Sequence, residues 1–428
     1  MTTPAGTDVS SSSFTVTPPS GGTGSSRGYV TTLGELATIA QKASQGIEPY
    51  KSAVLSIENF ANTGSSAAQP SNPNPTFWLY GTISGSQSCS GTLSPSFLGN
   101  GAPVIEAKAM VYGLLLPTNP TLANQYAADI RTELLELSTT SGYGGTSYSG
   151  GNQCILNLAW YTPGWIIAAD LIEDYPGWSD SDKHIFQTWL ATVVYPKADW
   201  ACDTRSNNWG AAGSVTSGMI ADYLTGSGIL MVDRTGATVN SHDAYLQAKK
   251  CQLDRMNGNS YMDNYNCHNP AVGFRADGAI PEELARGSTG CNGLWLVAED
   301  VPGSWSYTQT HLQGTILHAE FLLRRGDASI YNNLMPTGGG SLQRAYKFIL
   351  ANPNPGGLSW NWNLPNEIAE LEILYRHYRD SLLANQLKIG TSSRLIGGKS
   401  GQMLHFGTIT HGFAVGENPG SPPTVAAP

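Results

Sequence analysis

The chain has 428 residues, of which only 13% are charged, and its formal net charge is −9 at pH 7. This acidic balance argues against general binding to nucleic acids or anionic membranes, although a few Arg and Lys in one cleft would suffice for an anionic substrate. No stretch approaches the roughly 20 apolar residues that a membrane helix needs. The 11 Trp and 19 Tyr, with abundant Gly, Pro, Ser and Thr, are common in extracellular proteins that act on glycans.

The two ends of the chain have the composition of tails. Residues 1–28 are rich in Ser, Thr, Gly and Pro, which predicts a disordered segment. This segment has no apolar signal-peptide core, so we interpret it as the start of a mature secreted protein. A cytoplasmic protein with a disordered tail is the alternative. Residues 29–415 show no clear linker and predict a single domain, with a C-terminal tail at 416–428.

Helical periodicity dominates the domain. The expected helices cover residues 29–60, 122–137, 164–174, 182–194, 214–224, 311–324 and a segment after Pro365 that reaches Tyr378. Alternating strand patterns are scarce before residue 386, and the segments 386–398 and 402–413 predict a few short strands. Many helices joined by polar loops predict stacked helical hairpins that close into a ring, with the loops at one end forming a cleft. A plain helical bundle is the alternative.

The chain contains six cysteines, at positions Cys89, Cys154, Cys202, Cys251, Cys267 and Cys291. No Cys-x-x-Cys pair occurs, so a zinc site is not expected. An even number of cysteines in a chain rich in Tyr and Trp favours disulfides, and buried reduced thiols are the alternative. The sequence does not choose among the possible pairings.

Two consecutive Asn residues lie directly ahead of a predicted helix. In the segment DTRSNNWG, Asn207 and Asn208 stand beside Arg205 and Trp209. These side chains can bind a sugar carboxylate, with Trp209 stacking on a sugar ring. Alternatively, one Asn caps the helix and Trp209 belongs to the core.

A long polar loop follows at residues 259–269. It contains Tyr261, Asn264 and Tyr265, which we predict to bind substrate, and His268 between a Cys and an Asn. A lone histidine is more often structural than catalytic, but the polar surroundings of His268 favour a functional role.

Two further segments complete the candidate site. PEELARG carries Arg286, and YTQTH begins with Tyr307 just before a predicted helix. A Tyr at a helix start is usually a packing residue, although here its hydroxyl could reach a cleft.

Four motifs together resemble the alginate-lyase clan. They are NNWGAAGS, RADGAIPEELARG, YTQTHLQGTILHAEFLLRRGD and NEIAELEILYRHY. The resemblance spans roughly residues 76–380. Within the clan, this sequence is similar to polysaccharide lyase families five and thirty-eight. It implies an all-α fold, an (α/α) toroid or incomplete barrel of helical hairpins, and a secreted enzyme that needs no cofactor and no metal.

The resemblance also implies a reaction and roles for residues. Metal-independent β-elimination requires a donor that neutralises the C5 carboxylate, a base for the C5 proton and an acid for the departing O4. Asn208 matches the neutralising Asn, Arg286 the Arg that holds the substrate, and Tyr307 the catalytic Tyr. If proton and leaving oxygen lie on the same face of the sugar, one tyrosine can serve as both base and acid.

Two departures from the family pattern affect the site. In many family-five sequences a His follows the Asn pair, but Trp209 stands there in this chain. We predict that His268 takes its role, with His242 as the second choice. Residues 287–306 lengthen the spacing between Arg286 and Tyr307.

Other functions stay open at this stage. An inverting glycoside hydrolase on a helical toroid could use Asp277, Glu282 and Glu283, and a glycan-binding protein would use the aromatic residues alone. His311 and His318 fall on one face of a predicted helix, but no third metal ligand suggests itself. We expect a monomer that binds an anionic polysaccharide, alginate (polymannuronate) or glucuronan, and neither nucleic acid nor membrane.

Overall fold

The computed structural model describes residues 26–63, 101–139, 153–258, 273–284, 304–351, 364–398 and 403–413. Their helices are α1 (Leu33–Ser44), α2 (Tyr50–Thr63), α3 (Gly101–Leu115), α4 (Pro120–Thr139), α5 (Gln153–Leu171), α6 (Asp180–Trp189), a π-helical segment (Leu190–Val194), α7 (Tyr195–Thr204), α8 (Asn208–Tyr223), α9 (Ser241–Asn257), α10 (Pro281–Leu284), α11 (Ser304–Leu323), α12 (Leu342–Ala351), α13 (Leu364–Tyr378), α14 (Ser381–Leu387) and α15 (Gly407–His411). Within these ranges one antiparallel pair of strands occurs, β1 (Met231–Val232) with β2 (Thr238–Val239).

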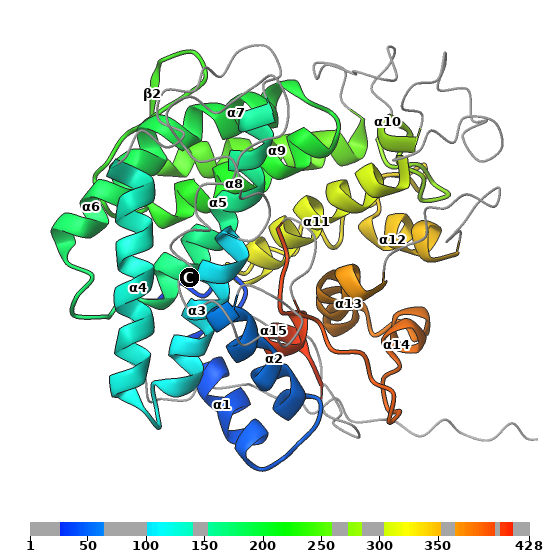
Figure 1. The fold of residues 1–428 in the computed structure, drawn as a ribbon. Coiled ribbons are helices and arrows are strands. Elements are labelled where there is room, and N and C mark those ends of the chain that lie inside the picture. The colour runs from blue at the N-terminus through cyan, green and yellow to red at the C-terminus, as the bar shows by residue number, and fades with distance from the viewer. Residues whose placement is uncertain are drawn as a thin grey trace, which may run out of the picture.

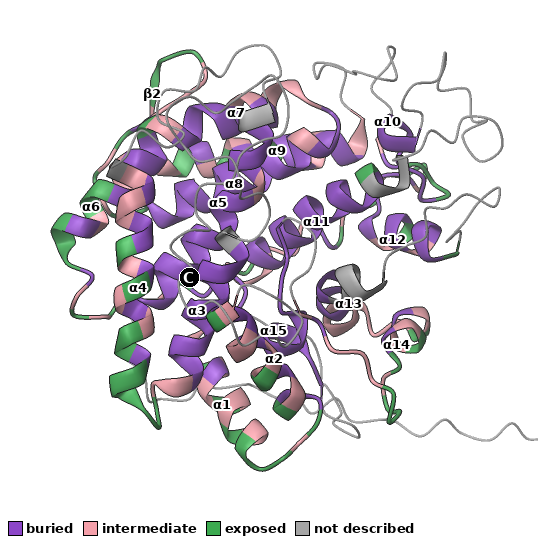
Figure 2. Cartoon of the chain, in the orientation of Figure 1, coloured by how far each residue is buried: buried purple, intermediate pink, exposed green. Residues whose placement is uncertain are grey.

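The helices form two layers that curve around the molecule (Figure 1). The inner row consists of α3, α5, α8 and α11, each packed on the next, and α13 follows α11. Helices α4, α7 and α9 pack against the outside of this row. All residues of α8 except Trp209 are buried, whereas α4 and α6 expose one face (Figure 2). The described residues thus form the helical-hairpin architecture predicted from the sequence.

Two arginines tie three inner helices together at their C-terminal ends. The Arg27 backbone N–H donates to Asp170 in the last turn of α5 at 2.6 Å, and its guanidinium donates to the Thr225 carbonyl just after α8 at 2.7 Å. Arg325, just after α11, donates to both carboxylate oxygens of Asp222 at 2.8 Å and to the Arg27 carbonyl at 2.9 Å. Helices α5, α8 and α11 are therefore parallel, and their N-termini share the opposite end.

Glycines let the central helices approach closely. A Cβ atom on Gly314 of α11 would lie 2.8 Å from the Ala211 carbonyl carbon of α8. A Cβ on Gly213 of α8 would lie 2.6 Å from the Cys202 nitrogen of α7. Real Cβ atoms do not come this close to backbone, so both positions depend on glycine.

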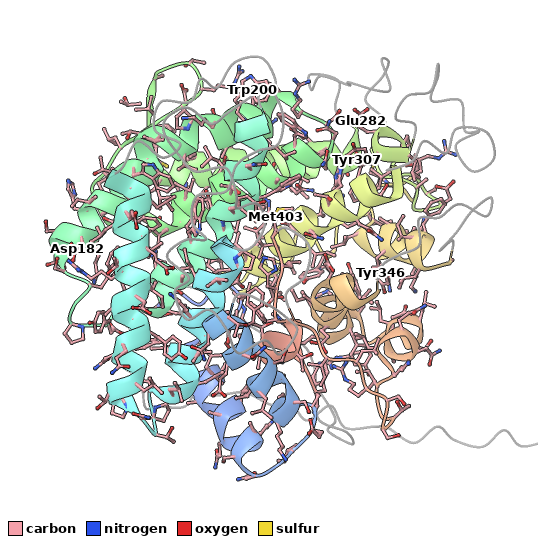
Figure 3. All side chains as sticks on the ribbon, viewed as in Figure 1. Asp182, Trp200, Glu282, Tyr307, Tyr346 and Met403 are labelled. Atoms are coloured by element: carbon pink, nitrogen blue, oxygen red, sulfur yellow. The ribbon has the colours of Figure 1, made fainter. Side chains whose placement is uncertain are left out.

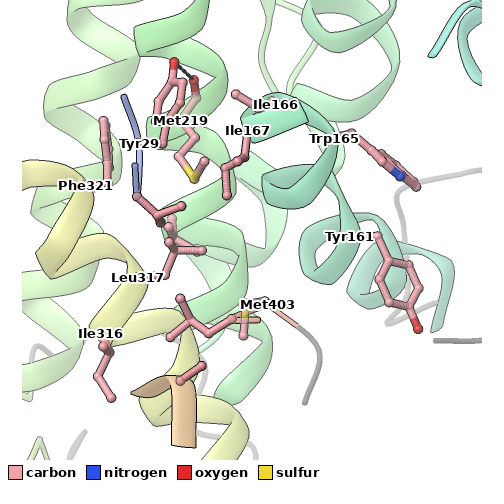
Figure 4. Close-up of a cluster of buried hydrophobic side chains, with 14 of the residues drawn as sticks. Tyr29, Tyr161, Trp165, Ile166, Ile167, Met219, Ile316, Leu317, Phe321 and Met403 are labelled. Atoms are coloured by element: carbon pink, nitrogen blue, oxygen red, sulfur yellow. Dashed lines mark hydrogen bonds between the residues drawn. The ribbon is translucent and has the colours of Figure 1, made fainter. Parts of the chain in front are cut away.

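The hydrophobic core joins segments from both ends of the chain (Figure 4). Tyr29 packs on Phe321 of α11, with ring centroids 5.8 Å apart, and its hydroxyl donates to the Met219 carbonyl at 3.5 Å. Met403 is 1% exposed, and its backbone N–H donates to Gln313 Oε1 at 3.3 Å. The N-terminal and C-terminal segments therefore both pack on α11.

The helices expected in the described ranges are present, with shifted ends. Helix α5 begins eleven residues before the predicted start at 164 and continues through Pro163. The predicted helix 182–194 is divided between α6, capped by Ser179, and the π-helical segment. Residues 26–28, placed in the tail by composition, are hydrogen-bonded to Asp170.

The strands expected after residue 386 are wrong for the described residues. That region forms the end of α14, turns and α15 instead. Residues 403–413 are all buried, so their short alternation does not mark one buried and one exposed face. The observed strand pair lies at 231–239, around a turn in which Asp233 accepts the N–H of Thr235 at 2.7 Å.

The expected disulfides are not found for the two cysteines whose side chains the structure describes. Cys202 of α7 and Cys251 of α9 are buried free thiols that lie together, and Ser214 Oγ donates to Cys202 Sγ at 3.5 Å. Cys89, Cys267, Cys291 and the side chain of Cys154 lie outside the described residues. Among the helices that are described, none combines the length and apolar character needed to cross a membrane.

Candidate active site

Helix α11 packs on α8 in the same direction, and the N-terminal half of α11 extends past the start of α8. Gly314 of α11 meets Ala211 of α8, and the two helices are parallel. Asn208 is one turn before Ala211, and Tyr307 is about two turns before Gly314. Trp200, Glu282 and Tyr307 lie on the same upper part of the molecule (Figure 3). The structure therefore brings two predicted catalytic residues, Asn208 and Tyr307, to one end of the inner row.

The Asn pair is built into the start of α8. Asn207 is the N-cap, and its Oδ1 accepts the Trp209 N–H at 3.1 Å. The alternative role that the sequence left open, a helix cap, is thus the observed one for Asn207. Asn208 is the first residue of the helix and is only 1% exposed. Helix N-termini carry a partial positive charge, which favours an anionic group at this end.

Arg255 of α9 holds the turn that leads into α8. Its Nε donates to the Arg205 carbonyl at 3.0 Å, and Nη2 donates to the Cys202 carbonyl at 2.8 Å. Nη1 donates to Ser214 Oγ at 2.9 Å. A buried guanidinium therefore satisfies carbonyls at the end of α7 and connects three helices.

Gly210 completes this turn. A Cβ at this position would lie 1.9 Å from the Arg205 carbonyl oxygen and 2.5 Å from Arg255 Nη2. The glycine in the motif NNWG is therefore required by the close approach of the backbone to the arginine.

Tyr307 lies in the first turn of α11 and is 38% exposed. The next four residues of the helix are buried. Its side chain is therefore accessible at the end of a buried helix.

A buried contact between a histidine and a carboxylate lies one turn further along α11. His311 Nδ1 is 2.9 Å from Glu283 Oε1, and the side chains are 1% and 0% exposed. Phe274 packs edge-on against the imidazole, with centroids 5.4 Å apart. His311 follows Tyr307 at i+4, so both occur on one face of α11. The contact between Glu283 and His311 was not predicted from the sequence, although the i+4 spacing of Tyr307 and His311 is visible there.

The other histidines lie elsewhere. His318 is fully buried, stacks on Phe321 with centroids 5.8 Å apart, and burial lowers its pKa to about 3. It therefore stays neutral at neutral pH. No group of three or more potential metal ligands occurs among the described residues.

His242 does not meet Asn208, which corrects its place as second choice for the missing histidine. Arg255 of α9 contacts Ser214 of α8, and Ala248 lies against Gly218. Helix α9 is therefore antiparallel to α8. Its exposed second residue, His242, lies at the opposite end of α8 from Asn208.

An aromatic and cationic cluster flanks the Asn pair. The Arg205 guanidinium carbon lies 4.9 Å from the Trp200 ring centroid and 6.0 Å from that of Trp209. The two indoles are 6.5 Å apart with an interplanar angle of 67°. Trp209 also packs against the hydrophobic core, which is the alternative role that the sequence left open, and its stacking on a sugar ring stays a prediction.

The three carboxylates of the hydrolase alternative have different surroundings. Glu283 is bound to His311, and Glu282 is 3% exposed. Asp277 is half-exposed, lies 3.5 Å from Arg275 and accepts the Ala279 N–H at 3.0 Å. Glu283 therefore contacts an imidazole, and only Asp277 of the three is exposed.

Five predicted site residues, Tyr261, Asn264, Tyr265, His268 and Arg286, lie outside the described residues. Their roles stay predictions.

Solved structures resemble this chain, whereas no family model and no curated protein matches it. An alginate lyase from Bacteroides ovatus matches with a TM-score of 0.53 and 14% identity, over 84% of this chain and 94% of that one. Alginate lyase A1-III from Sphingomonas species A1 matches with a TM-score of 0.53 and 13% identity, over 90% and 96%. The fold is that of alginate lyases.

A third match extends this likeness. A tyrosine-to-phenylalanine variant of alginate lyase A1-III, complexed with tetrasaccharide, has a TM-score of 0.53 and 12% identity over 90% of this chain and 95% of its own. Because all these identities are low, the likeness concerns the fold, and it confirms the predicted (α/α) toroid.

Proposed function

We propose that this protein is a polysaccharide lyase that cleaves a polymer of uronic acids by β-elimination. The observation that supports the proposal is that Asn208 and Tyr307 lie toward the N-terminal ends of two adjacent, parallel helices, α8 and α11, on a fold shared with alginate lyases. The resemblance implied that Asn208 and Tyr307 act in one reaction, although their sequence motifs are about 100 positions apart.

The chemistry follows from what the two groups can do. The Asn208 amide and the α8 N-terminus donate hydrogen bonds and positive potential to the C5 carboxylate, which makes the C5 proton more acidic. The phenolate form of Tyr307 takes this proton and becomes the phenol, the C5–H electrons form the C4=C5 double bond, and the C4–O4 bond breaks. The tyrosine then returns the proton to the departing O4. No metal enters this proposal.

The candidate substrates are alginate, especially polymannuronate, and glucuronan. A single tyrosine can serve as base and acid only where the C5 proton and O4 lie on one face of the ring, as the sequence analysis noted. We also propose that the enzyme is secreted, because such polymers are too large to enter a cell unaided.

The test measures ultraviolet absorbance, since β-elimination creates a conjugated C4=C5 double bond. Purified protein is incubated with polymannuronate, polyguluronate, glucuronan and a glycosaminoglycan, and reducing ends are counted in parallel. Tyr307→Phe is expected to abolish the absorbance increase while retaining wild-type circular dichroism. Tyr126→Phe, on the outer helix α4, is the matched control and should remain active.

Each other outcome has a definite meaning. A flat absorbance trace on every polymer contradicts the lyase proposal. Reducing ends released without absorbance support the hydrolase alternative. Full activity in Tyr307→Phe removes Tyr307 from the reaction.

A further inference from the structure

Trp200 extends the candidate site beyond the residues that the sequence singled out. It lies one turn before the end of α7, and α7 ends at the turn that leads into Asn208. Its side chain is half-buried, and its backbone carbonyl accepts Thr204 Oγ1 at 2.7 Å within the helix. Trp200 is therefore accessible and fixed on a regular helix next to the Asn pair.

Arg205 connects this indole to the second one. Its guanidinium lies over Trp200 and also near Trp209, at 4.9 Å and 6.0 Å from the ring centroids. The backbone of Arg205 is held by Arg255, whose Nε donates to its carbonyl at 3.0 Å. The cation is thus positioned on the aromatic surface by a buried neighbour.

The carboxylate of Asp203, two residues before Arg205, has partners on other elements. Asp203 lies 2.5 Å from Arg234 Nη2, and Gln247 Nε2 donates to its second oxygen at 3.2 Å. The charge of Asp203 is therefore balanced on its own side of α7.

We infer that Trp200, Arg205 and Trp209 form a subsite for the uronate ring next to the ring that reacts. Indole faces bind the apolar C–H face of a sugar, and a guanidinium beside them binds a carboxylate with defined geometry. Trp209 lies in the first turn of α8, so a sugar ring stacked here would lie at the same end of the inner row as Tyr307. This inference rests on the proposed function. It adds that tight binding requires an oligomer long enough to occupy this subsite as well.

Steady-state kinetics with uronate oligomers of increasing length tests the subsite. Trp200→Leu is expected to raise KM about tenfold for a hexamer and to leave KM for the shortest cleaved oligomer and kcat unchanged. Tyr245→Leu is the matched control, because Tyr245 is a half-buried aromatic that packs on Phe321 at the far end of α11. Equal KM values for wild type and Trp200→Leu at every length would overturn the inference.

A binding measurement keeps the two proposals separable. Tyr307→Phe protein carrying 5-fluorotryptophan is titrated with a mannuronate hexamer, and the Trp200 fluorine signal is assigned from its loss in Trp200→Phe. A shift of this signal supports the subsite even where a leucine variant fails to fold. If wild type cleaves polymer but the Trp200 signal does not move, the subsite is wrong and the lyase stands. If the signal moves without any cleavage, the subsite stands in a binding protein.

Discussion

At the scale of single residues, Gly210 is the most constrained position of the candidate site. Its missing Cβ leaves room for the Arg205 carbonyl oxygen, which would otherwise be 1.9 Å away. We expect Gly210→Ala to lower the free energy of unfolding by about 3 kcal/mol and to reduce kcat/KM, because the turn that carries Asn208 must move. Thermal melting and the absorbance assay measure both effects.

The control for this prediction is another glycine. A Cβ on Gly398 would lie 3.9 Å from its nearest neighbour, Ser56 Oγ, so Gly398→Ala should be tolerated. A Gly210→Ala protein with wild-type melting temperature and activity would show that the turn is not sterically constrained.

His318 gives the protein a dependence on pH. Burial lowers the pKa of this imidazole from 6.5 to about 3 in the folded state. Below about pH 6.5 the imidazole of His318 is protonated in the unfolded chain but not in the folded chain. Its contribution to the free energy of unfolding is therefore fully present above that pH and is lost as the pH falls. Relative to wild type, His318→Leu should gain about 2 kcal/mol on going from about pH 7 to pH 5.

Urea denaturation at the two pH values measures this gain. Leu317→Met, at the neighbouring buried position of α11, changes no titratable group, so it serves as the control and should follow the pH dependence of wild type. Identical pH dependence in wild type and His318→Leu would contradict the assigned pKa shift.

The residues of the site differ in how far the sequence could predict them. Asn208 and Tyr307 belong to local motifs, and the structure brings both to one end of the helices. Glu283 and His311 are 28 positions apart, and their contact depends on how α10 packs on α11. No local pattern carries that information. His242 was misjudged for the same reason, because the direction of α9 is a tertiary property.

At the scale of helices, Arg255 connects α7, α8 and α9. It is 4% exposed and donates to two backbone carbonyls and to Ser214. We expect Arg255→Lys to cost about 2 kcal/mol or more of stability, since one ammonium cannot reproduce the planar set of donors. It should also lower kcat/KM, because the turn before Asn208 loses its anchor.

Arg344 offers a matched comparison. It also donates to backbone carbonyls, at 3.1 Å to Ala276 and 2.7 Å to Gly338, but at an exposed site. Arg344→Lys should therefore change stability little, as water can replace the lost donor. If both substitutions have the same small effect, burial of Arg255 does not matter as we argue.

The sequence predicted helices better than it predicted their ends or the strands. Amphipathic periodicity over three or more turns is a strong signal, and it located α4, α6 and α13. Helix α5 is buried along most of its length, so its N-terminal half shows no amphipathic pattern. In α15 the short alternation is overridden by packing, since Gly407 sits where a Cβ would lie 2.4 Å from the Ala369 Cα of α13.

At the scale of the whole molecule, the two ends of the inner helices have different tasks. The N-terminal ends carry the candidate site, and the C-terminal ends are joined by Arg27 and Arg325. Arg325 also lies over the rings of Tyr29 and Phe321, at 5.0 Å and 5.6 Å. Stability should therefore be separable from catalysis by substitutions at the second end.

Arg325→Met tests this separation. The change leaves the partly buried Asp222 carboxylate without the guanidinium that binds both of its oxygens at 2.8 Å. We expect a loss of about 3 kcal/mol in the free energy of unfolding, much of it from the uncompensated charge. Chemical denaturation measures this loss, while kcat and KM well below the melting temperature should stay within about twofold of wild type.

A second substitution distinguishes the cause of that loss. Asp222→Asn in the Arg325→Met background removes the uncompensated charge, so the double variant should regain part of the stability. If Arg325→Met instead lowers kcat/KM as much as Arg255→Lys does, the two ends of the inner row are mechanically coupled. A substitution at the C-terminal ends of the inner helices would then change the geometry of the candidate site at their N-terminal ends.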